Sequence, residues 1–283
     1  MPIIEIIKAI LYGIVEGITE WSPVSSTGHL ILLNDIIPMN VSPEFWELFL
    51  VVIQLGAIMA VVIYFWHKIW PFNTKVKNKP FIRYDVMNLW VKIVVACIPA
   101  VIVGLLFDDW IEEHLYSSTV VAIMLILLGI AFIIVENKNK KESIPPRVTS
   151  LRELTYRDAI IVGLFQVIAA VLPGTSRSGS TIIGGLIIGI ERTVAAEFTF
   201  FLAIPVMFGA SFLKLLKFGF NYLPIEILLL VIGCVTAFVV SLGCIKFLMG
   251  YIKKNDFKIF GYYRIILGVI VLVYFTVKSF LAQ

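Results

Sequence analysis

Long apolar runs make up most of the chain, and short breaks of polar residues, proline or glycine separate them. Five runs precede a polar stretch at residues 137–157, and five follow it. In each half, two short or interrupted runs come before three longer ones, which approach the roughly 20 residues that a helix needs to cross a bilayer. The runs lie at about residues 3–20, 28–37, 45–66, 89–107, 119–135, 159–172, 180–190, 196–216, 225–249 and 265–281. The pattern predicts an all-α integral membrane protein with about ten hydrophobic helices.

The composition supports this prediction. Of the 283 residues, 60% are hydrophobic and 15% are charged, whereas a soluble domain carries about 25% charged residues. The net charge of +4 is modest and no basic arm is present, so we expect no nucleic-acid partner. Cys97, Cys234 and Cys244 lie inside apolar runs without the spacing of a metal site, so we expect them to pack in the interior.

The two halves of the chain share a weak internal repeat. Five pairs of residues align at a constant separation of 150: Gly13 with Gly163, Glu16 with Gln166, Pro23 with Pro173, Ser26 with Ser176, and Glu47 with Glu197. Chance alignment of apolar runs is the alternative, but these residue types are harder to match by accident than leucines. We interpret residues 1–283 as a single membrane domain with repeats at about 1–136 and 158–283, joined by a polar linker at 137–157.

Charged segments indicate how the chain is oriented. Basic residues gather at 67–92, in the linker and at 253–264, so these segments should face the cytoplasm. The acidic segment 108–114 is expected to be a loop on the other side. Counting spans between these segments makes the two halves an inverted-topology repeat. The short runs of each half would then form re-entrant helical hairpins, with tips at 22–28 and 173–179 meeting near the midplane.

A first polar cluster begins with two acids. Glu16 and Glu20 are four residues apart, so they share one face of a helix. One charge at the centre of a bilayer costs about 2.5–3.5 kcal/mol, and two like charges on one turn cost more. A metal ion between the two acids, or a proton on one of them, relieves this conflict. The alternative is that both acids lie in the interface and are merely solvated.

Three hydroxyl residues and a histidine complete the first cluster. Ser25, Ser26 and Thr27 follow Pro23 and begin the next apolar run, where hydroxyl groups commonly cap a helix. His29 is three residues after Ser26, on the same face of the first turn, where an imidazole can activate or protonate a hydroxyl. A lone histidine is more often structural, but the neighbouring hydroxyls favour a catalytic role.

The second cluster, residues 173–181, places five hydroxyl residues and two glycines around Arg177. A guanidinium at the start of a helix, among N–H and O–H donors, matches a phosphate group in charge and geometry. The alternative is a polar loop in which Arg177 only neutralises Glu16 or Glu20. With one cluster supplying acids, a hydroxyl and a base, and the other supplying anion recognition, the pair is typical of phosphoryl transfer. A site within the membrane favours a lipid substrate.

These two motifs resemble those of the bacterial undecaprenyl-diphosphatases of the bacitracin-resistance type. Glu16-x-x-x-Glu20 runs into Pro-Val-Ser-Ser-Thr-Gly-His at 23–29, and Pro-Gly-Thr-Ser-Arg-Ser-Gly-Ser-Thr occupies 173–181. The resemblance covers the full length, and both motifs are complete. It implies a multi-pass enzyme of the bacterial plasma membrane that removes the terminal phosphate of undecaprenyl diphosphate at the outer face. This reaction recycles the cell-wall carrier lipid, confers bacitracin resistance and uses a divalent cation, magnesium or calcium.

The resemblance also implies roles for individual residues. Glu16 and Glu20 would hold the metal, with Glu20 also catalytic. Ser26 would be the nucleophile, His29 its acid/base partner and Arg177 the diphosphate clamp. The phosphate site would be lined by Ser25, Thr27, Ser176, Arg177, Ser178 and Thr181. Spacing leaves open a phosphoserine at Ser26, a phosphohistidine at His29, or direct attack by a metal-bound water.

Partners and the runner-up function follow from the same layout. We expect the polyprenyl substrate and membrane lipids as partners, and the sequence leaves a homodimer open. An inverted-repeat transporter or flippase of polyprenyl phosphate lipids would have the same arrangement of tips. The paired acids beside Ser26 and His29 favour an enzyme, because moving a lipid phosphate needs neither of them.

Overall fold

A computed structural model describes residues 2–73, 80–142, 145–219 and 222–281. These residues form helices without any strand beyond two isolated bridges, which confirms the all-α prediction. The helices are α1 (Pro2–Thr19), α2 (Ser26–Ile36), α3 (Pro43–Tyr64), α4 (Trp66–Ile69), α5 (Tyr84–Leu115), α6 (Ser118–Glu142), α7 (Tyr156–Val171), α8 (Arg177–Ile187), α9 (Arg192–Phe218), α10 (Pro224–Ile252) and α11 (Lys258–Leu281).

Within the described residues, six helices are long and apolar enough to cross a membrane, namely α3, α5, α6, α9, α10 and α11. Large apolar side chains such as Leu105, Phe212 and Phe247 are exposed on the outside of these helices. Apolar surface of this extent needs a bilayer to cover it. The chain is therefore a helical membrane protein.

The structure departs from the sequence-based expectations at three places. Residues 108–114, expected to be a loop, belong to α5, and α6 continues to Glu142 into the expected linker. Polar residues can extend a helix beyond its apolar run because helix propensity does not require hydrophobicity. Arg264, expected among the cytoplasmic loop charges, is fully buried in α11. Of the basic residues expected at 67–92, Lys75, Lys77 and Lys79 lie outside the described residues.

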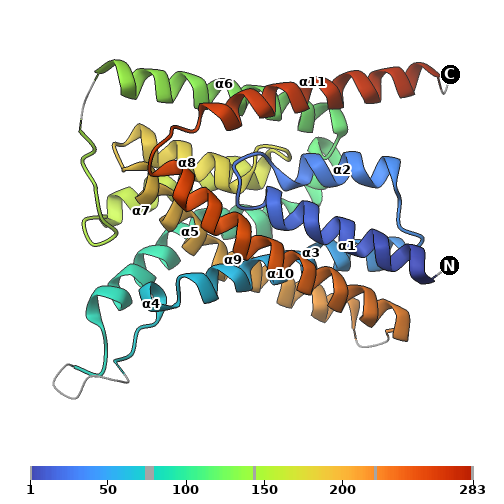
Figure 1. Cartoon of the computed structure of the whole chain (residues 1–283), viewed down its shortest axis with the longest axis horizontal. Helices are drawn as coiled ribbons and strands as arrows, with labels where there is room; N and C mark the ends of the chain where they lie inside the picture. The colour runs from blue at the N-terminus through green and yellow to red at the C-terminus, as the bar shows by residue number, and fades with distance from the viewer. Residues whose placement is uncertain (1, 74–79, 143–144, 220–221, 282–283) are drawn as a thin grey trace.

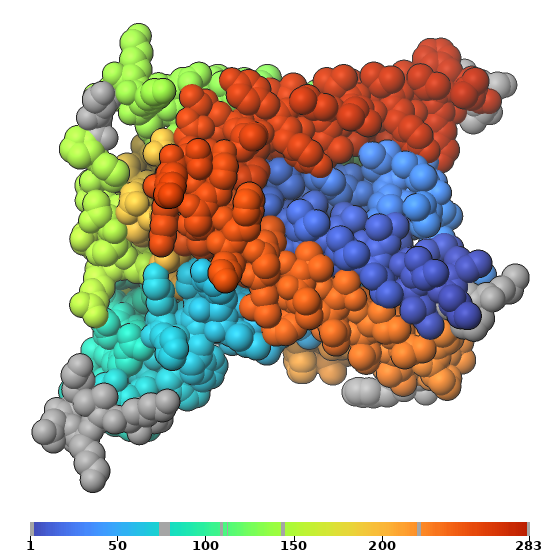
Figure 2. All heavy atoms as spheres, viewed as in Figure 1, coloured from blue at the N-terminus to red at the C-terminus, as the bar shows by residue number. Residues whose placement is uncertain are grey.

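Two helical hairpins organise the interior (Figure 1). In that view α1 and α2 lie to the right, α7 and α8 lie to the left, and the turns that connect each pair lie near the centre. Each hairpin packs on a long helix from the other half of the chain, α1 on α10 and α7 on α5, while α6 packs along α11. On the face shown in Figure 2, α1 and α2 form the surface between α10 and α11.

Glycine makes the close packing of both hairpins possible. A Cβ atom at Gly13 of α1 would lie 2.7 Å from the carbonyl oxygen of Gly233 in α10. A Cβ atom at Gly163 of α7 would lie 2.2 Å from the carbonyl oxygen of Ala96 in α5. Backbone atoms cannot move aside as a flexible side chain can, so both positions require glycine.

Candidate active site

The turn of the first hairpin connects the end of α1, which carries two acids, to the capped start of α2. Glu20 follows the last residue of α1, and its N–H donates to the Glu16 carbonyl oxygen at 3.0 Å, so both acids belong to one helical turn. Glu16 is fully buried and Glu20 is 7% exposed. Pro23 cannot continue the helix. Ser25 then caps α2, accepting a hydrogen bond from the N–H of Gly28 at 3.4 Å.

The second hairpin turn is built in the same way. Ser176 caps α8 by accepting a hydrogen bond from the N–H of Gly179 at 3.2 Å. Both capping serines are left-handed, with φ of 73° at Ser25 and 69° at Ser176, a strained conformation that clusters at functional sites. The sequence repeat aligns Ser26 with Ser176, but the caps make Ser25 the equivalent residue. From the aligned prolines, Pro23 and Pro173, the capping serine therefore comes one residue later in the second turn than in the first.

The two turns meet at an ion pair between Glu20 and Arg177. Nη2 of Arg177 donates to Oε1 of Glu20 at 2.9 Å, although the residues are 157 positions apart in the sequence. Oε2 of Glu20 accepts a hydrogen bond from Oγ of Ser26 at 2.7 Å. Oγ of Ser178 donates to the backbone oxygen of Glu20 at 3.2 Å. The structure thus brings residues of both sequence motifs into one buried cluster.

Hydrogen bonds within the second half hold Arg177 in place. Its Nη1 donates to the backbone oxygen of Thr199 in α9 at 3.1 Å. Oγ1 of Thr181 donates to the backbone oxygen of Arg177 at 2.9 Å, and Oγ1 of Thr199 donates to Oγ1 of Thr181 at 2.9 Å. Thr199 is a site residue that sequence reasoning misses, because one hydroxyl within an apolar run carries little signal.

The side chain of His29 makes its hydrogen bonds to groups other than the Ser26 hydroxyl. Its Nδ1 lies 2.7 Å from the backbone oxygen of Ser25, and its Nε2 lies 2.7 Å from the hydroxyl of Tyr263 in α11. The imidazole also stacks on the Tyr263 ring, with centroids 5.6 Å apart. The three-residue spacing places Ser26 and His29 in the first turn of α2, but their side chains bond to different partners. The hydrogen-bond partner of Ser26 is Glu20.

The remaining predicted phosphate-site residues surround this cluster. The hydroxyl oxygens of Ser176 and Ser178 are 3.1 Å apart. Ser25 is buried, and Thr27 is half-buried in the first turn of α2. Because α2 and α8 both begin at these turns, two helix N-termini contribute free N–H groups and partial positive charge there. This arrangement suits a phosphate group.

Arg264 is a second arginine of the site that the sequence pattern does not reveal. Its Nη1 donates to the backbone oxygen of Pro23 at 3.2 Å, and its Nη2 donates to those of Gly174 and Thr175 at 3.0 and 2.9 Å. One guanidinium group thus contacts both hairpin turns. In the sequence, Arg264 follows a lysine-containing loop and resembles the last of its charges, so only the tertiary structure reveals its position.

Glu16 is the second acid predicted to hold a metal ion. Both of its carboxylate oxygens are buried and have no hydrogen-bond partner. In the part of the chain that the structure describes, no group of three His, Cys, Asp or Glu side chains is placed to hold a metal ion. A metal ion at this site would therefore have two carboxylate ligands from the protein, Glu16 and Glu20. Magnesium is commonly held by one or two carboxylates together with substrate phosphates. The unpartnered carboxylate of Glu16, one helical turn from Glu20, fits such an ion.

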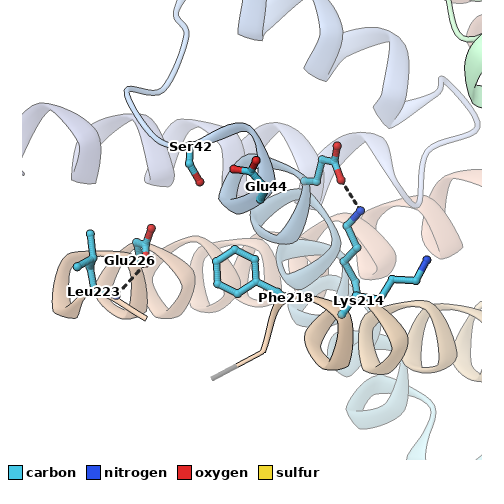
Figure 3. A pocket seen from close by; sticks show the side chains of 8 residues that line it. Ser42, Glu44, Lys214, Phe218, Leu223 and Glu226 are labelled. Atoms are coloured by element: carbon cyan, nitrogen blue, oxygen red, sulfur yellow. Dashed lines mark hydrogen bonds and ion pairs between the residues drawn. The ribbon is translucent and has the colours of Figure 1, made fainter. Parts of the chain in front are cut away.

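Two surface hollows lie away from this cluster. One, of about 530 Å³, lies between the start of α3, the end of α9 and the start of α10, and Figure 3 shows Lys214 and Glu226 in its wall. The other, of about 590 Å³, includes the ion pair of Lys68 and Glu197 at 2.6 Å. Neither hollow is lined by a predicted site residue, so the hairpin turns remain the candidate site.

The fold and the cluster define a helical membrane protein in which two hairpin turns form a buried polar cluster. The family model described as bacitracin resistance protein BacA matches residues 9–270. The chain belongs to this family.

Individual relatives match over nearly the whole chain. An undecaprenyl-diphosphatase of Desulfitobacterium hafniense is 59% identical over 279 residues, which is 99% of this chain and 99% of the relative. An undecaprenyl-diphosphatase of Enterococcus faecalis is 56% identical over 96% of this chain and 98% of its own. Undecaprenyl-diphosphatase 1 of Clostridium acetobutylicum is 57% identical over 98% of this chain and 100% of its own.

Proposed function

We propose that this protein hydrolyses undecaprenyl diphosphate to undecaprenyl phosphate and inorganic phosphate, and thereby recycles the cell-wall carrier lipid and confers bacitracin resistance. The relatives are named for this activity, and the family is described by bacitracin resistance. The contact between Glu20 and Arg177 is the observation that supports a site for it. Phosphoryl transfer depends on positioning and charge stabilisation, which this cluster of acid, hydroxyl and arginine supplies.

Ser26 is the proposed nucleophile. Its Oγ attacks the terminal phosphorus while the bond from that phosphorus to the bridging oxygen breaks, and undecaprenyl phosphate leaves. Glu20 takes the Ser26 proton, because its Oε2 already accepts the hydrogen bond from that hydroxyl. Water then cleaves the phosphoserine and releases inorganic phosphate. His29, held by Tyr263, serves as the acid/base group for the water.

Arg177 and the two helix starts bind the diphosphate in this proposal. Ser25, Thr27, Ser176, Ser178 and Thr181 line the phosphate site through hydroxyl groups or by holding Arg177. A magnesium or calcium ion bound by Glu16 and Glu20 would neutralise charge on the diphosphate when present. The unpartnered oxygens of Glu16 support this assignment.

The proposed architecture is a pair of inverted repeats, about 1–136 and 158–283, each with a re-entrant hairpin. Matching contacts support it. Gly13 and Gly163 make equivalent close approaches. Glu47 pairs with Lys214 in one hollow, and Glu197 pairs with Lys68 in the other. One copy of the chain supplies both turns, so the proposed site needs no second subunit.

The proposed site opens to the outer face of the plasma membrane. Basic segments around 67–92 and 253–258 mark the cytoplasmic side. The start of α1 and the end of α11 both lie at the right of Figure 1, whereas the end of α6 and the start of α7 lie at the left. The hairpin of α1 and α2 therefore enters from the outer side.

The decisive assay is phosphate release from a long-chain polyprenyl diphosphate by purified protein in detergent. We expect release by the wild-type protein, its loss with a chelator, and a fall in kcat/KM of roughly a hundredfold or more in Arg177→Gln. Ser26→Ala should abolish any phosphoenzyme that can be trapped with labelled substrate. Unchanged release in Arg177→Gln and with chelator would contradict the proposed site, and unchanged release in Ser26→Ala would remove Ser26 as the nucleophile.

A further inference from the structure

Helix α11 reaches the hairpin turns with two adjacent residues, Tyr263 and Arg264, that have no part in the chemistry assigned above. We propose that both are positioning residues. Arg264 fixes the two turns relative to each other, and Tyr263 fixes the imidazole of His29. The inference rests on the proposed function, because it names what holds that site together.

Arg264 bonds from a third helix, α11, to the backbone of both turns at once. Its acceptors are the backbone oxygens of Pro23, Gly174 and Thr175. These residues precede the capping serines, so their carbonyl groups have no place in the helical ladders of α2 and α8. Buried carbonyl groups need a hydrogen-bond donor. A single fork-shaped guanidinium supplies donors for all three.

The charge of Arg264 also points to a role at the site. Arg264 is fully buried, and among the described residues no carboxylate lies within ion-pair distance of it. Burying an arginine without a counterion is costly, so packing alone does not account for it. The carbonyl dipoles of the turns offset part of this cost.

The position of Arg264 explains how it acts on catalysis. Its acceptor Pro23 is three residues after Glu20, and its acceptor Thr175 is two residues before Arg177. The bond between Glu20 and Arg177 is therefore braced within three residues on each side. A diphosphate that inserts between Glu20 and Arg177 would break their ion pair. The bonds from Arg264 would then keep the two turns in register.

Tyr263 acts on the first turn from the same helix. Its hydroxyl group lies 2.7 Å from Nε2 of His29, and its ring stacks on the imidazole at an interplanar angle of 8°. With Nδ1 of His29 at the backbone oxygen of Ser25, both ring nitrogens are fixed. The orientation of the imidazole thus depends on α11.

Arg264→Gln and Arg264→Lys test the first role, with Arg192→Gln as the matched control. Arg192 likewise holds buried acceptors, the carboxylate oxygens of Glu136, but it does so at the start of α9, away from both turns. We expect Arg264→Gln to lower kcat between about tenfold and a hundredfold, as a small misplacement of reacting groups does. KM should change less than about threefold, because Arg177 still binds the diphosphate. Arg264→Lys should recover part of kcat, and Arg192→Gln should lower thermal stability with kcat unchanged.

Tyr263→Phe tests the second role, with Tyr262→Phe as its control. Tyr262 is exposed and precedes Tyr263 on the same helix. Tyr263→Phe keeps the stacked ring and removes the hydroxyl, so we expect a fall in kcat of roughly tenfold at unchanged thermal stability. Tyr262→Phe should behave as the wild-type protein.

The outcomes separate this inference from the proposed function. Normal kcat in monodisperse Arg264→Gln and Arg264→Lys would overturn the role of Arg264, as would a loss in kcat that Arg192→Gln reproduces at equal thermal stability. If both Arg264 variants fail to fold, Tyr263→Phe decides, and a kcat equal to that of Tyr262→Phe would overturn the inference. A wild-type protein without phosphate release, or full activity in Arg177→Gln, would instead contradict the proposed function.

Discussion

Single residues at and beside the hairpin turns carry buried groups and backbone strain that cost stability. Both oxygens of Glu16 are buried without a partner, and Ser25 and Ser176 hold left-handed backbone conformations. Unpartnered groups and backbone strain of this kind cost of order 1–3 kcal/mol each. Other packing must offset these costs, and their concentration at one place is what marks the site.

Glu16→Gln should stabilise the protein while weakening its use of the cation. The amide has nearly the shape of the carboxylate but no charge to bury, so we expect the free energy of unfolding to rise by about 1–3 kcal/mol. The cation concentration for half-maximal activity should rise roughly tenfold or more. Thermal unfolding in detergent and a cation titration measure the two effects. Glu47→Gln, at a surface ion pair, is the control, and equal effects from both would refute this role of Glu16.

Replacing both Glu20 and Arg177 by glutamine tests whether Arg177 binds the diphosphate or only neutralises the charge of Glu20. Removing one partner of a buried ion pair leaves an unpaired charge, whereas removing both does not. We therefore expect either single variant to unfold at a lower temperature and the double variant to recover stability. If Arg177 only neutralised Glu20, activity would recover as well. We expect phosphate release by the double variant to stay near background, so near-normal release would support the simpler role.

At the scale of helices, glycine is required at some positions and not at others. Gly163 of α7 lies against the backbone of α5, whereas Gly104, within α5, has nothing within 4 Å of the place where its Cβ would be. We expect Gly163→Ala to destabilise by about 1–3 kcal/mol or more, because a backbone oxygen blocks the new methyl group. Gly104→Ala should be neutral or stabilise by up to about 1 kcal/mol through helix propensity. Equal thermal stability of the two variants would contradict the close packing of α7 on α5.

The whole molecule is predicted to expose its two hollows on opposite sides of the membrane. Lys217 lines the hollow of about 530 Å³ and Arg152 lines the one of about 590 Å³. In a variant without the three native cysteines, Lys217→Cys should react with an impermeant maleimide in intact cells. Arg152→Cys should react only after permeabilisation, because its segment belongs to the basic, cytoplasmic side. Labelling of both positions from the same side would contradict the inverted topology.

The sequence by itself determined where most helices lie and which two segments carry the polar motifs that meet in the structure. Apolar runs and their breaks are local signals, and the ends of α3, α9 and α10 each lie within about four residues of their predicted runs. The composition of 173–181 likewise indicates anion binding without any tertiary contact. The ends of helices were less predictable, since α5 and α6 continue through polar residues that were expected to be loops.

Only the tertiary structure decided which side chains meet. The pairing of Ser26 with Glu20, the bond from His29 to Tyr263 and the bridge made by Arg264 depend on how turns and helices pack. Arg264 and Pro23 are 241 positions apart, and no periodicity or motif spacing reports a contact at that range. Local sequence fixes local conformation because its energies arise between near neighbours. The partners in the site depend instead on burial, which exists only once the two halves have packed together.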